Sequence, residues 1–222
     1  MKILFMGTPD FALFSLKALV EESGHEICGV ITQPDKPKGR GYALLPPPVK
    51  VYAEERGIAV FQPATLKDGA FLETLEKLDP EMIIVVAYGK ILPSYVLDYP
   101  KYGCINVHAS LLPRLRGASP IQQAIVLGEE KTGVTTMYMD EGLDTGDIIL
   151  KKEMLLNDEI TAGELHDEMM VHGSELLKET IELIAKGEAP REKQNDEESS
   201  YAPMINKALG EIDWNKNAFD IK

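Results

Sequence analysis

The stretch Lys2-Ile-Leu-Phe-Met6-Gly7 is a nearly continuous apolar run that stops at a glycine. Such a run is typical of a strand buried on both faces of a parallel sheet. Residues 10–22 follow with apolar side chains at helical spacing, and Glu26-Ile-Cys-Gly-Val-Ile-Thr32 predicts a second strand. A strand, a helix and a strand over about thirty residues make a βαβ unit.

The alternation of strands and helices continues and predicts a doubly wound α/β fold, with a mostly parallel sheet and helices on both faces. Met82-Ile-Ile-Val-Val-Ala87 is the most hydrophobic run and is expected at the centre of the sheet. Thr161-Ala-Gly-Glu164 matches a capping box, which predicts a helix that runs to Gly187. Ser119 is expected to cap a short helix that Gly128 ends. The other expected elements are helices at 49–56 and 66–78 and strands at 58–61, 104–108, 134–139 and 147–151, the last two paired through the loop 140–146.

Charge and cysteine content limit the classes of function. The net charge of −13 argues against broad nucleic-acid binding, which needs a basic face. Residues 36–50 are a local exception, because they carry Lys36, Lys38, Arg40 and Lys50 and no acid. Two cysteines are too few for a disulfide scaffold and fit a reducing compartment. No stretch reads as a signal peptide or a membrane span, so a cytoplasmic location is expected.

The composition also predicts a division of the chain. Residues 1–187 are expected to form one domain. Residues 188–206 are expected to be a linker, since 188–200 contain no aliphatic side chain larger than alanine. Residues 207–222 are too few to fold alone and are interpreted as a remnant of the start of a C-terminal domain.

Asn106 and His108 are the first candidates for chemistry. Side chains alternate along a strand, so Ile105 and Val107 can face the core while Asn106 and His108 point together to the other side. Ligands of open α/β sheets bind beyond the carboxyl ends of the strands, where this strand stops. A purely structural, hydrogen-bonded role for both residues remains an alternative.

The acidic turn Asp140-Glu-Gly-Leu-Asp144-Thr-Gly-Asp147 is the second candidate. Its spacing does not match a calcium loop, so no metal site is expected. One of its aspartates could instead sit against His108 and hold it charged or correctly oriented. Cys104 is interpreted as a small buried hydrophobe, and Ser110 lacks the G-x-S-x-G context of a nucleophile.

Taken together, these strings resemble a known family. Asn106-Val-His108-Ala-Ser-Leu-Leu-Pro113-Arg-Leu-Arg-Gly117 is similar to the signature of the folate-dependent formyltransferases, whose fold is Rossmann-like. Within that superfamily, the sequence resembles the methionyl-tRNA formyltransferase family from residue 1 to about 187. The strings that carry this resemblance are Gly7-Thr-Pro-Asp-Phe11, Thr32-Gln-Pro-Asp-Lys-Pro-Lys-Gly-Arg-Gly41, Val86-Ala-Tyr-Gly89 and Asp140-Glu-Gly-Leu-Asp-Thr-Gly-Asp147. Members usually continue into an OB-type C-terminal domain, most of which would be missing here.

The resemblance implies an activity, namely transfer of the formyl group of 10-formyltetrahydrofolate to methionine on initiator tRNA, without a metal. Asn106, His108 and Asp144 would be catalytic. Initiator methionyl-tRNA would be bound by Lys36, Lys38 and Arg40 in the loop 33–48, and the enzyme is expected to be a monomer. The folate would be bound by Val86, Ala87, Tyr88, Gly89, Ser110, Leu111, Leu112, Pro113 and Asp140.

Two other interpretations remain open. A different user of formyl-folate, such as a glycinamide ribonucleotide or sugar-nucleotide formyltransferase or a formyl-folate hydrolase, would keep Asn106, His108 and Asp144. The basic loop favours tRNA over these acceptors. A catalytically inactive folate- or RNA-binding module is the other alternative, and the presence of all three polar residues argues against it.

Overall fold

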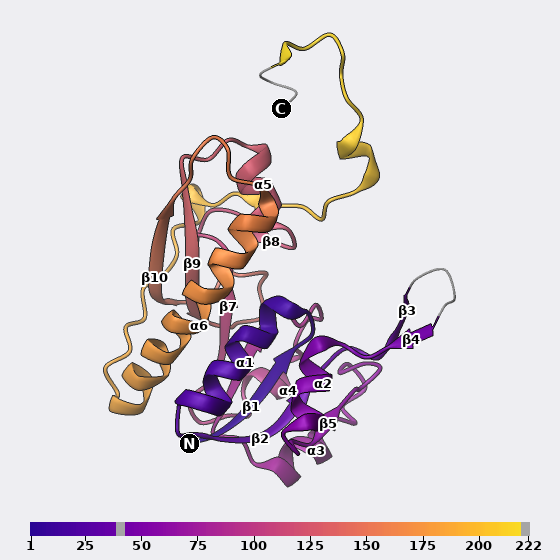
Figure 1. The fold of residues 1–222 in the computed structure, drawn as a ribbon. Helices are drawn as coiled ribbons and strands as arrows, with labels where there is room; N and C mark the ends of the chain where they lie inside the picture. The colour runs from indigo at the N-terminus through magenta and orange to yellow at the C-terminus, as the bar shows by residue number, and fades with distance from the viewer. Residues whose placement is uncertain (39–42, 219–222) are drawn as a thin grey trace.

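The computed structural model describes residues 1–38 and 43–218, and the core of this part of the chain is a seven-stranded sheet (Figure 1). Neighbouring strands are parallel, except that the second strand from one edge is antiparallel to both of its neighbours. This confirms the predicted α/β class with a mostly parallel sheet. The strand order is β10 (Ile148–Leu155), β9 (Lys131–Tyr138), β7 (Cys104–His108), β6 (Met82–Val86), β1 (Lys2–Gly7), β2 (Glu26–Ile31) and β5 (Val60–Phe61).

Helices cover both faces of the sheet (Figure 1). Successive residues of β1 take part in different apolar clusters. Phe5 packs in a cluster with Leu16, to which the helices 48–55 and 162–186 also contribute, whereas Leu4 packs in one with Leu75 and Val96. β6 lies in the middle of the sheet with all five residues buried, as its apolar run predicts. The helices are α1 (Asp10–Glu22), α2 (Pro48–Glu55), α3 (Leu72–Leu78), α4 (Ser94–Leu97), α5 (Pro120–Val126) and α6 (Ala162–Lys186).

Local sequence signals predicted the ends of some helices correctly and those of others incorrectly. The capping box of Thr161 and Glu164 is formed, and Gly187 ends α6 in the left-handed conformation, as predicted. The expected helix 66–78 was too long, because α3 begins only at Leu72. Ser119 is the residue before α5, as predicted, but its hydroxyl accepts the Ile205 N–H instead of capping the helix. None of the helices in the described ranges is both long and apolar enough to cross a membrane.

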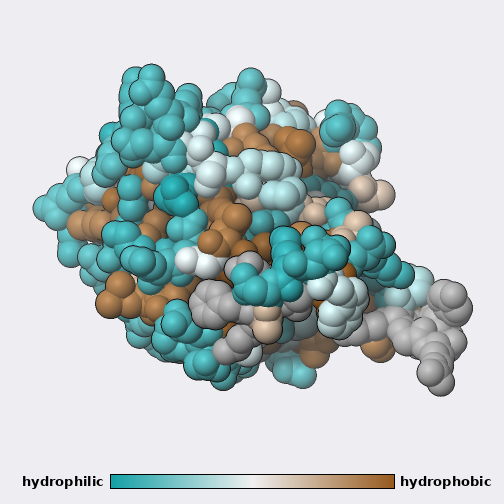
Figure 2. All heavy atoms as spheres, turned by 90° about the horizontal axis from the view of Figure 1, so that it is seen from above, coloured by the Kyte–Doolittle hydropathy of each residue, from teal (hydrophilic) through white to brown (hydrophobic). Residues whose placement is uncertain are grey.

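Two segments project from the domain. The strands β3 (Lys36–Lys38) and β4 (Ala43–Leu45) form an antiparallel hairpin within the loop 33–48 that projects to one side (Figure 1). Residues 203–218 extend away from the domain and are exposed, with Trp214 80% exposed. Seen from above, Figure 2 shows hydrophilic and apolar side chains interspersed on one face of the molecule.

Residues 191–202, called the strap below, lie along the domain although the composition of 188–206 suggests a linker. Glu192 forms an antiparallel bridge with Ile148 at the start of β10. Near the other end of the strap, β11 (Tyr201–Ala202) pairs in parallel with β8 (Arg116–Gly117). A single turn of 3-10 helix, Asp196–Glu198, lies between these anchors. The strap is therefore joined to two loops that are far from it in the sequence.

Candidate active site

The candidate site lies where the parallel strands end. In the sheet, Gly7 of β1 is level with Val86 of β6, and Val85 is level with Asn106 of β7. The carboxyl ends of these three strands therefore meet at one edge, and the loops that follow them come together there.

Asn106 and His108 share one face of β7, while Ile105 and Val107 are buried in the apolar cluster under α1 and α6. The imidazole of His108 is only 7% exposed. Asn106 is half-buried. The alternation expected from the sequence thus aims both polar side chains away from that cluster, at the end of the strand.

The carboxylate of Asp144 joins the two. Its Oδ2 accepts the Gly117 N–H at 2.9 Å and lies 3.7 Å from Nδ1 of His108. Its Oδ1 is 3.4 Å from Nδ2 of Asn106, which donates to it. Asp144 has φ of +54°, a left-handed conformation that non-glycine residues rarely adopt. The structure therefore brings together the three residues that the sequence singled out, from positions up to 38 residues apart.

The other ring nitrogen of His108 has a partner that sequence reasoning missed. Nε2 lies 2.9 Å from the carbonyl oxygen of Leu115. A carbonyl only accepts hydrogen bonds, so Nε2 must carry the proton and donate it. Nδ1 is then the nitrogen that faces Asp144, at a distance longer than a normal hydrogen bond. A backbone carbonyl carries no residue-specific signal, so the sequence could not reveal this contact.

The loop 109–117 is held by hydrogen bonds at its start. Ser110 is fully buried, its hydroxyl donates to the Arg114 carbonyl at 2.6 Å, and its own carbonyl accepts from Thr135. The Leu112 N–H donates in turn to the Thr135 hydroxyl. Leu112 is buried, whereas Leu111 and Pro113 are half-buried. The buried Ser110 hydroxyl is thus engaged structurally, which agrees with its rejection as a nucleophile.

The turn after β6 presents backbone to the same edge of the sheet. Ala87 and Gly89 both have positive φ, at 45° and 78°, and both are exposed. The Tyr88 carbonyl accepts from Nε2 of Gln33 at 2.8 Å, while its side chain points into the core, where burial raises the pKa of the phenol to about 12. A Cβ at residue 89 would lie 2.4 Å from Nε2 of Gln33 and would displace that side-chain amide, and the φ of 78° independently favours glycine. Val86 is fully buried.

The remaining acidic residues of the 140–147 turn are arranged separately from Asp144. Asp140 is exposed, and its Oδ1 accepts from the Gly142 N–H at 3.0 Å and from the Thr145 hydroxyl at 2.7 Å. Asp147 pairs with Arg191 at 3.7 Å. Across the described ranges, no three His, Cys, Asp or Glu side chains gather in a way that could hold a metal ion.

The basic hairpin is connected to the turn after β6 through its base. Lys36 is exposed, and its ammonium donates at 2.6 Å to the oxygen of Gln33, whose nitrogen bonds the Tyr88 carbonyl. Lys50 pairs with Asp35 at 2.8 Å, so its charge is neutralised locally. Lys38 belongs to β3, and Arg40 lies outside the described residues.

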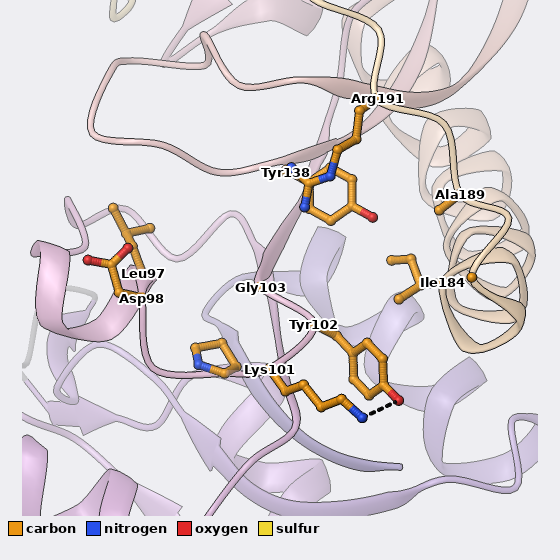
Figure 3. A pocket seen from close by; sticks show the side chains of 11 residues that line it. Leu97, Asp98, Lys101, Tyr102, Gly103, Tyr138, Ile184, Ala189 and Arg191 are labelled. Atoms are coloured by element: carbon orange, nitrogen blue, oxygen red, sulfur yellow. Dashed lines mark hydrogen bonds between the residues drawn. The ribbon is translucent and has the colours of Figure 1, made fainter.

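A pocket of about 420 Å³ lies elsewhere, at the amino-terminal end of β7 (Figure 3). Its lining includes Tyr102, Tyr138, Ile184 and Arg191, and none of the residues proposed for catalysis. Arg191 lies over the ring of Tyr138, 3.6 Å from its centroid. This pocket is therefore separate from the cluster of Asn106, His108 and Asp144.

Cys104, on the same face of β7 as Asn106, is not an available nucleophile. It is 2% exposed, and burial raises the pKa of its thiol to about 12. Its Sγ donates to the Val96 carbonyl at 3.5 Å. Both observations agree with its interpretation as a small buried hydrophobe.

Comparison with known proteins shows the family to which this chain belongs. The family described as "Formyl transferase" matches residues 1–181. A similar solved structure is the N-formyltransferase from Helicobacter canadensis in complex with folinic acid and dTDP-3-aminofucose, with a TM-score of 0.73 and 25% identity over 100% of this chain and 78% of that one. Glycinamide ribonucleotide transformylase 1 from Symbiobacterium toebii shares the fold, with a TM-score of 0.71 and 21% identity over 84% of this chain and 88% of that one. The protein is a member of the formyl transferase family.

Similar sequences narrow the class further. The methionyl-tRNA formyltransferase of Clostridioides difficile (strain 630) is 60% identical over 221 residues, which cover 100% of this chain and 71% of that protein. The methionyl-tRNA formyltransferase of Alkaliphilus oremlandii (strain OhILAs) is 55% identical over 222 residues, with the same coverage. Within the family, the chain belongs to the methionyl-tRNA formyltransferases, which confirms the resemblance seen in the sequence.

Proposed function

We propose that the chain transfers the formyl group of 10-formyltetrahydrofolate to the α-amino group of methionine on initiator methionyl-tRNA, in the cytoplasm, for translation initiation. The observation that carries the proposal is the Asp144 carboxylate, which lies 3.7 Å from Nδ1 of His108 and 3.4 Å from Nδ2 of Asn106. One chain supplies all three residues, so a monomer is sufficient for the chemistry.

The reaction needs stabilisation of charge rather than a protein nucleophile. The amine attacks the formyl carbon, a new C–N bond forms, and the bond from that carbon to N10 of the folate breaks. The amine loses one proton and N10 gains one. Negative charge develops on the formyl oxygen during this exchange, and fixed hydrogen-bond donors aimed at such an oxygen are often the largest catalytic contribution.

Asn106 and His108 supply the donors in this proposal. An amide nitrogen carries two N–H groups, and only one of those of Asn106 is needed for Asp144. Nε2 of His108 is held by Leu115, so Nδ1 is the nitrogen left for the reacting oxygen. Asp144 balances the charge of a protonated imidazole at 3.7 Å and assists removal of the amine proton through water.

The folate is proposed to lie between the turn after β6 and the loop after β7. Ala87 and Gly89 expose backbone there, and hydrogen-bonding groups of Val86, Ala87, Tyr88 and Gly89 can read the edge of a pterin ring. The loop Ser110, Leu111, Leu112 and Pro113 would line the formyl end, because it follows His108 directly. Asp140 is proposed to contact the folate from the 140–147 turn, in which its carboxylate accepts from Gly142 and Thr145.

The tRNA is proposed to approach over the hairpin. Lys36 is exposed at its base, and Lys38 and Arg40 follow it along the chain. The net charge of −13 repels phosphates from the rest of the surface, so a local basic segment would direct the tRNA to this side. Gln33 links the hairpin to the turn after β6 through Lys36 and Tyr88, and these contacts support a tRNA path that passes close to the proposed folate site.

A comparison of acceptors tests this proposal. The protein would be incubated with 10-formyltetrahydrofolate and, separately, with initiator methionyl-tRNA, glycinamide ribonucleotide, an amino-sugar nucleotide and no acceptor. We expect formylated methionine only with the charged tRNA. Transfer to one of the small amines without transfer to the tRNA would show a different formyltransferase, and release of formate without an acceptor would show a hydrolase.

A further inference from the structure

The strap lies against both loops that complete the surroundings of His108. At one end, Arg191 packs on Tyr138 (Figure 3) and pairs with Asp147, so it contacts both ends of the turn that carries Asp144. At the other end, the backbone of Ser200 and Ala202 bonds Arg116 and Ala118 in the loop after β7. The strap thus joins the two loops from which the partners of His108 come.

Gln194 is the central contact of the strap. Its side-chain nitrogen donates to the carbonyl oxygens of Asp144 at 2.9 Å and Gly146 at 2.8 Å. Its side-chain oxygen accepts from Nε of Arg116 at 3.0 Å and from Nη2 at 2.8 Å. The amide of Gln194 therefore binds the backbone of Asp144 and the side chain of Arg116. Arg116 directly precedes Gly117, whose N–H donates to the Asp144 carboxylate.

Ser200 makes an equivalent contact on the other side of the imidazole. Its hydroxyl accepts the Leu115 N–H at 2.9 Å, and the carbonyl of Leu115 accepts from Nε2 of His108. Leu115 and Asp144 both have left-handed backbones, with φ of 56° and 54°. Side chains with a Cβ disfavour that conformation, so each residue needs surrounding contacts to hold it there.

We propose that the strap, residues 191–202, is a positioning element of the active site, and that Gln194 is a positioning residue that sets the Asp144 carboxylate against His108. The proposal rests on the catalytic roles assigned above. It follows from the fact that both ring nitrogens of His108 face residues with left-handed backbones, each of which the strap bonds directly. Gln194 acts through Asp144 and touches no reacting atom.

Variants of Gln194 separate this role from simple stabilisation. Gln194→Met keeps the side-chain size and removes every hydrogen bond, whereas Gln194→Glu keeps an acceptor for Arg116 but loses the donor to Asp144 and Gly146. Asn195→Ala is the matched control, because the hydrogen bonds of that neighbouring amide stay within residues 195–198 of the strap. Each protein would be assayed for kcat and for the KM of both substrates, at temperatures well below its melting transition. The ring ¹⁵N shifts of His108 would be recorded by NMR.

We expect both Gln194 variants to lower kcat by about tenfold to a hundredfold, as a small misplacement of reacting groups does. KM should change by no more than about twofold, because the proposed role gives Gln194 no contact with either substrate. The ring shifts of His108 should move in both variants and stay unchanged in Asn195→Ala.

Normal kcat with unchanged ring shifts would overturn the proposal, as would a loss of kcat without a change in the ring shifts. Ring shifts that move while kcat stays normal would support the positioning role and count against the proposed catalytic role of His108 instead.

Discussion

The cluster of Asn106, His108 and Asp144, called the corner below, and the basic hairpin β3–β4 differ in how their charged and polar groups are held. In the corner, His108 and Asp144 are almost buried, and each has partners from distant parts of the chain. In the hairpin, Lys36 is exposed and donates to Gln33 at the base. Fixed donors lower a reaction barrier, whereas mobile surface charges attract a polyanion. The comparison predicts that substitutions in the corner change kcat and substitutions in the hairpin change KM for tRNA.

The largest effect is expected for His108→Ala. Loss of an oxyanion donor that also takes part in proton transfer should lower kcat by about 10³-fold or more, with little change in KM. Rapid-quench measurement of a single turnover on formyl-folate and charged tRNA checks this. His166→Ala is the control, because His166 lies on α6 and packs against Phe11. Turnover close to that of the unmodified protein would refute the assignment of His108.

Asp144→Asn should come next, with kcat lower by about 10²-fold. The asparagine can still accept the Gly117 N–H, so the backbone should stay in place while the negative charge beside Nδ1 of His108 is lost. Steady-state kinetics of this variant and of Glu141→Gln, an exposed acid of the same turn, would separate the local charge from the general acidity of the loop. Equal rates for the two variants would contradict the special role of Asp144.

The corner also shows which parts of the site could be predicted from the sequence. Strand alternation on β7 was enough to place Asn106 and His108 on one face, because the period of a strand is fixed by its geometry. The partners that hold them could not be predicted. Leu115 acts through a carbonyl, and Gln194 bonds residues 48 to 78 positions away, so neither leaves a local pattern.

Helix ends and loops were likewise predictable only where the contacts that determine them are local in the sequence. The helix α6 was predicted at both ends, because its capping box and terminal glycine act within a few residues. The turn before α3 and the partner of the Ser119 hydroxyl were not predicted, since that hydroxyl bonds the distant Ile205 N–H. The polar composition of 188–206 predicts a linker, whereas the strap contacts the domain mainly through backbone and polar groups, with Ala202 also buried in the apolar core. Composition therefore predicts what a segment can bury, and not what it can hydrogen-bond.

A smaller effect is expected in the hairpin. Lys36→Ala should raise the KM for tRNA by about a few-fold and reduce the slope of its salt dependence by about 1, because one phosphate contact is removed. The kcat should be unchanged. Binding and kinetics over a series of salt concentrations measure this, with Lys131→Ala as the control because Lys131 pairs with Glu153 away from the hairpin. A fall in kcat alone would mean that the hairpin acts on the chemistry, and the distinction between the two regions would fail.

The smallest effect is expected at the base of the hairpin, where hydrogen bonds from Lys50 and Gln62 hold the pKa of Asp35 below its ordinary value. A lowered pKa means that the folded protein binds the proton less tightly than the unfolded chain. The stabilisation is therefore fully present above the ordinary aspartate pKa of about 3.9 and is lost as the pH falls from there through the lowered pKa. Asp35→Asn should slightly lower the melting temperature at pH 7, and the difference from the unmodified protein should shrink below about pH 4. Asp68→Asn, at an exposed aspartate that accepts the Ala70 N–H, is the control. A difference for Asp35→Asn that stayed constant with pH would show that the carboxylate charge does not hold the hairpin base, and the hairpin would then be joined to the domain through Gln33 and the backbone.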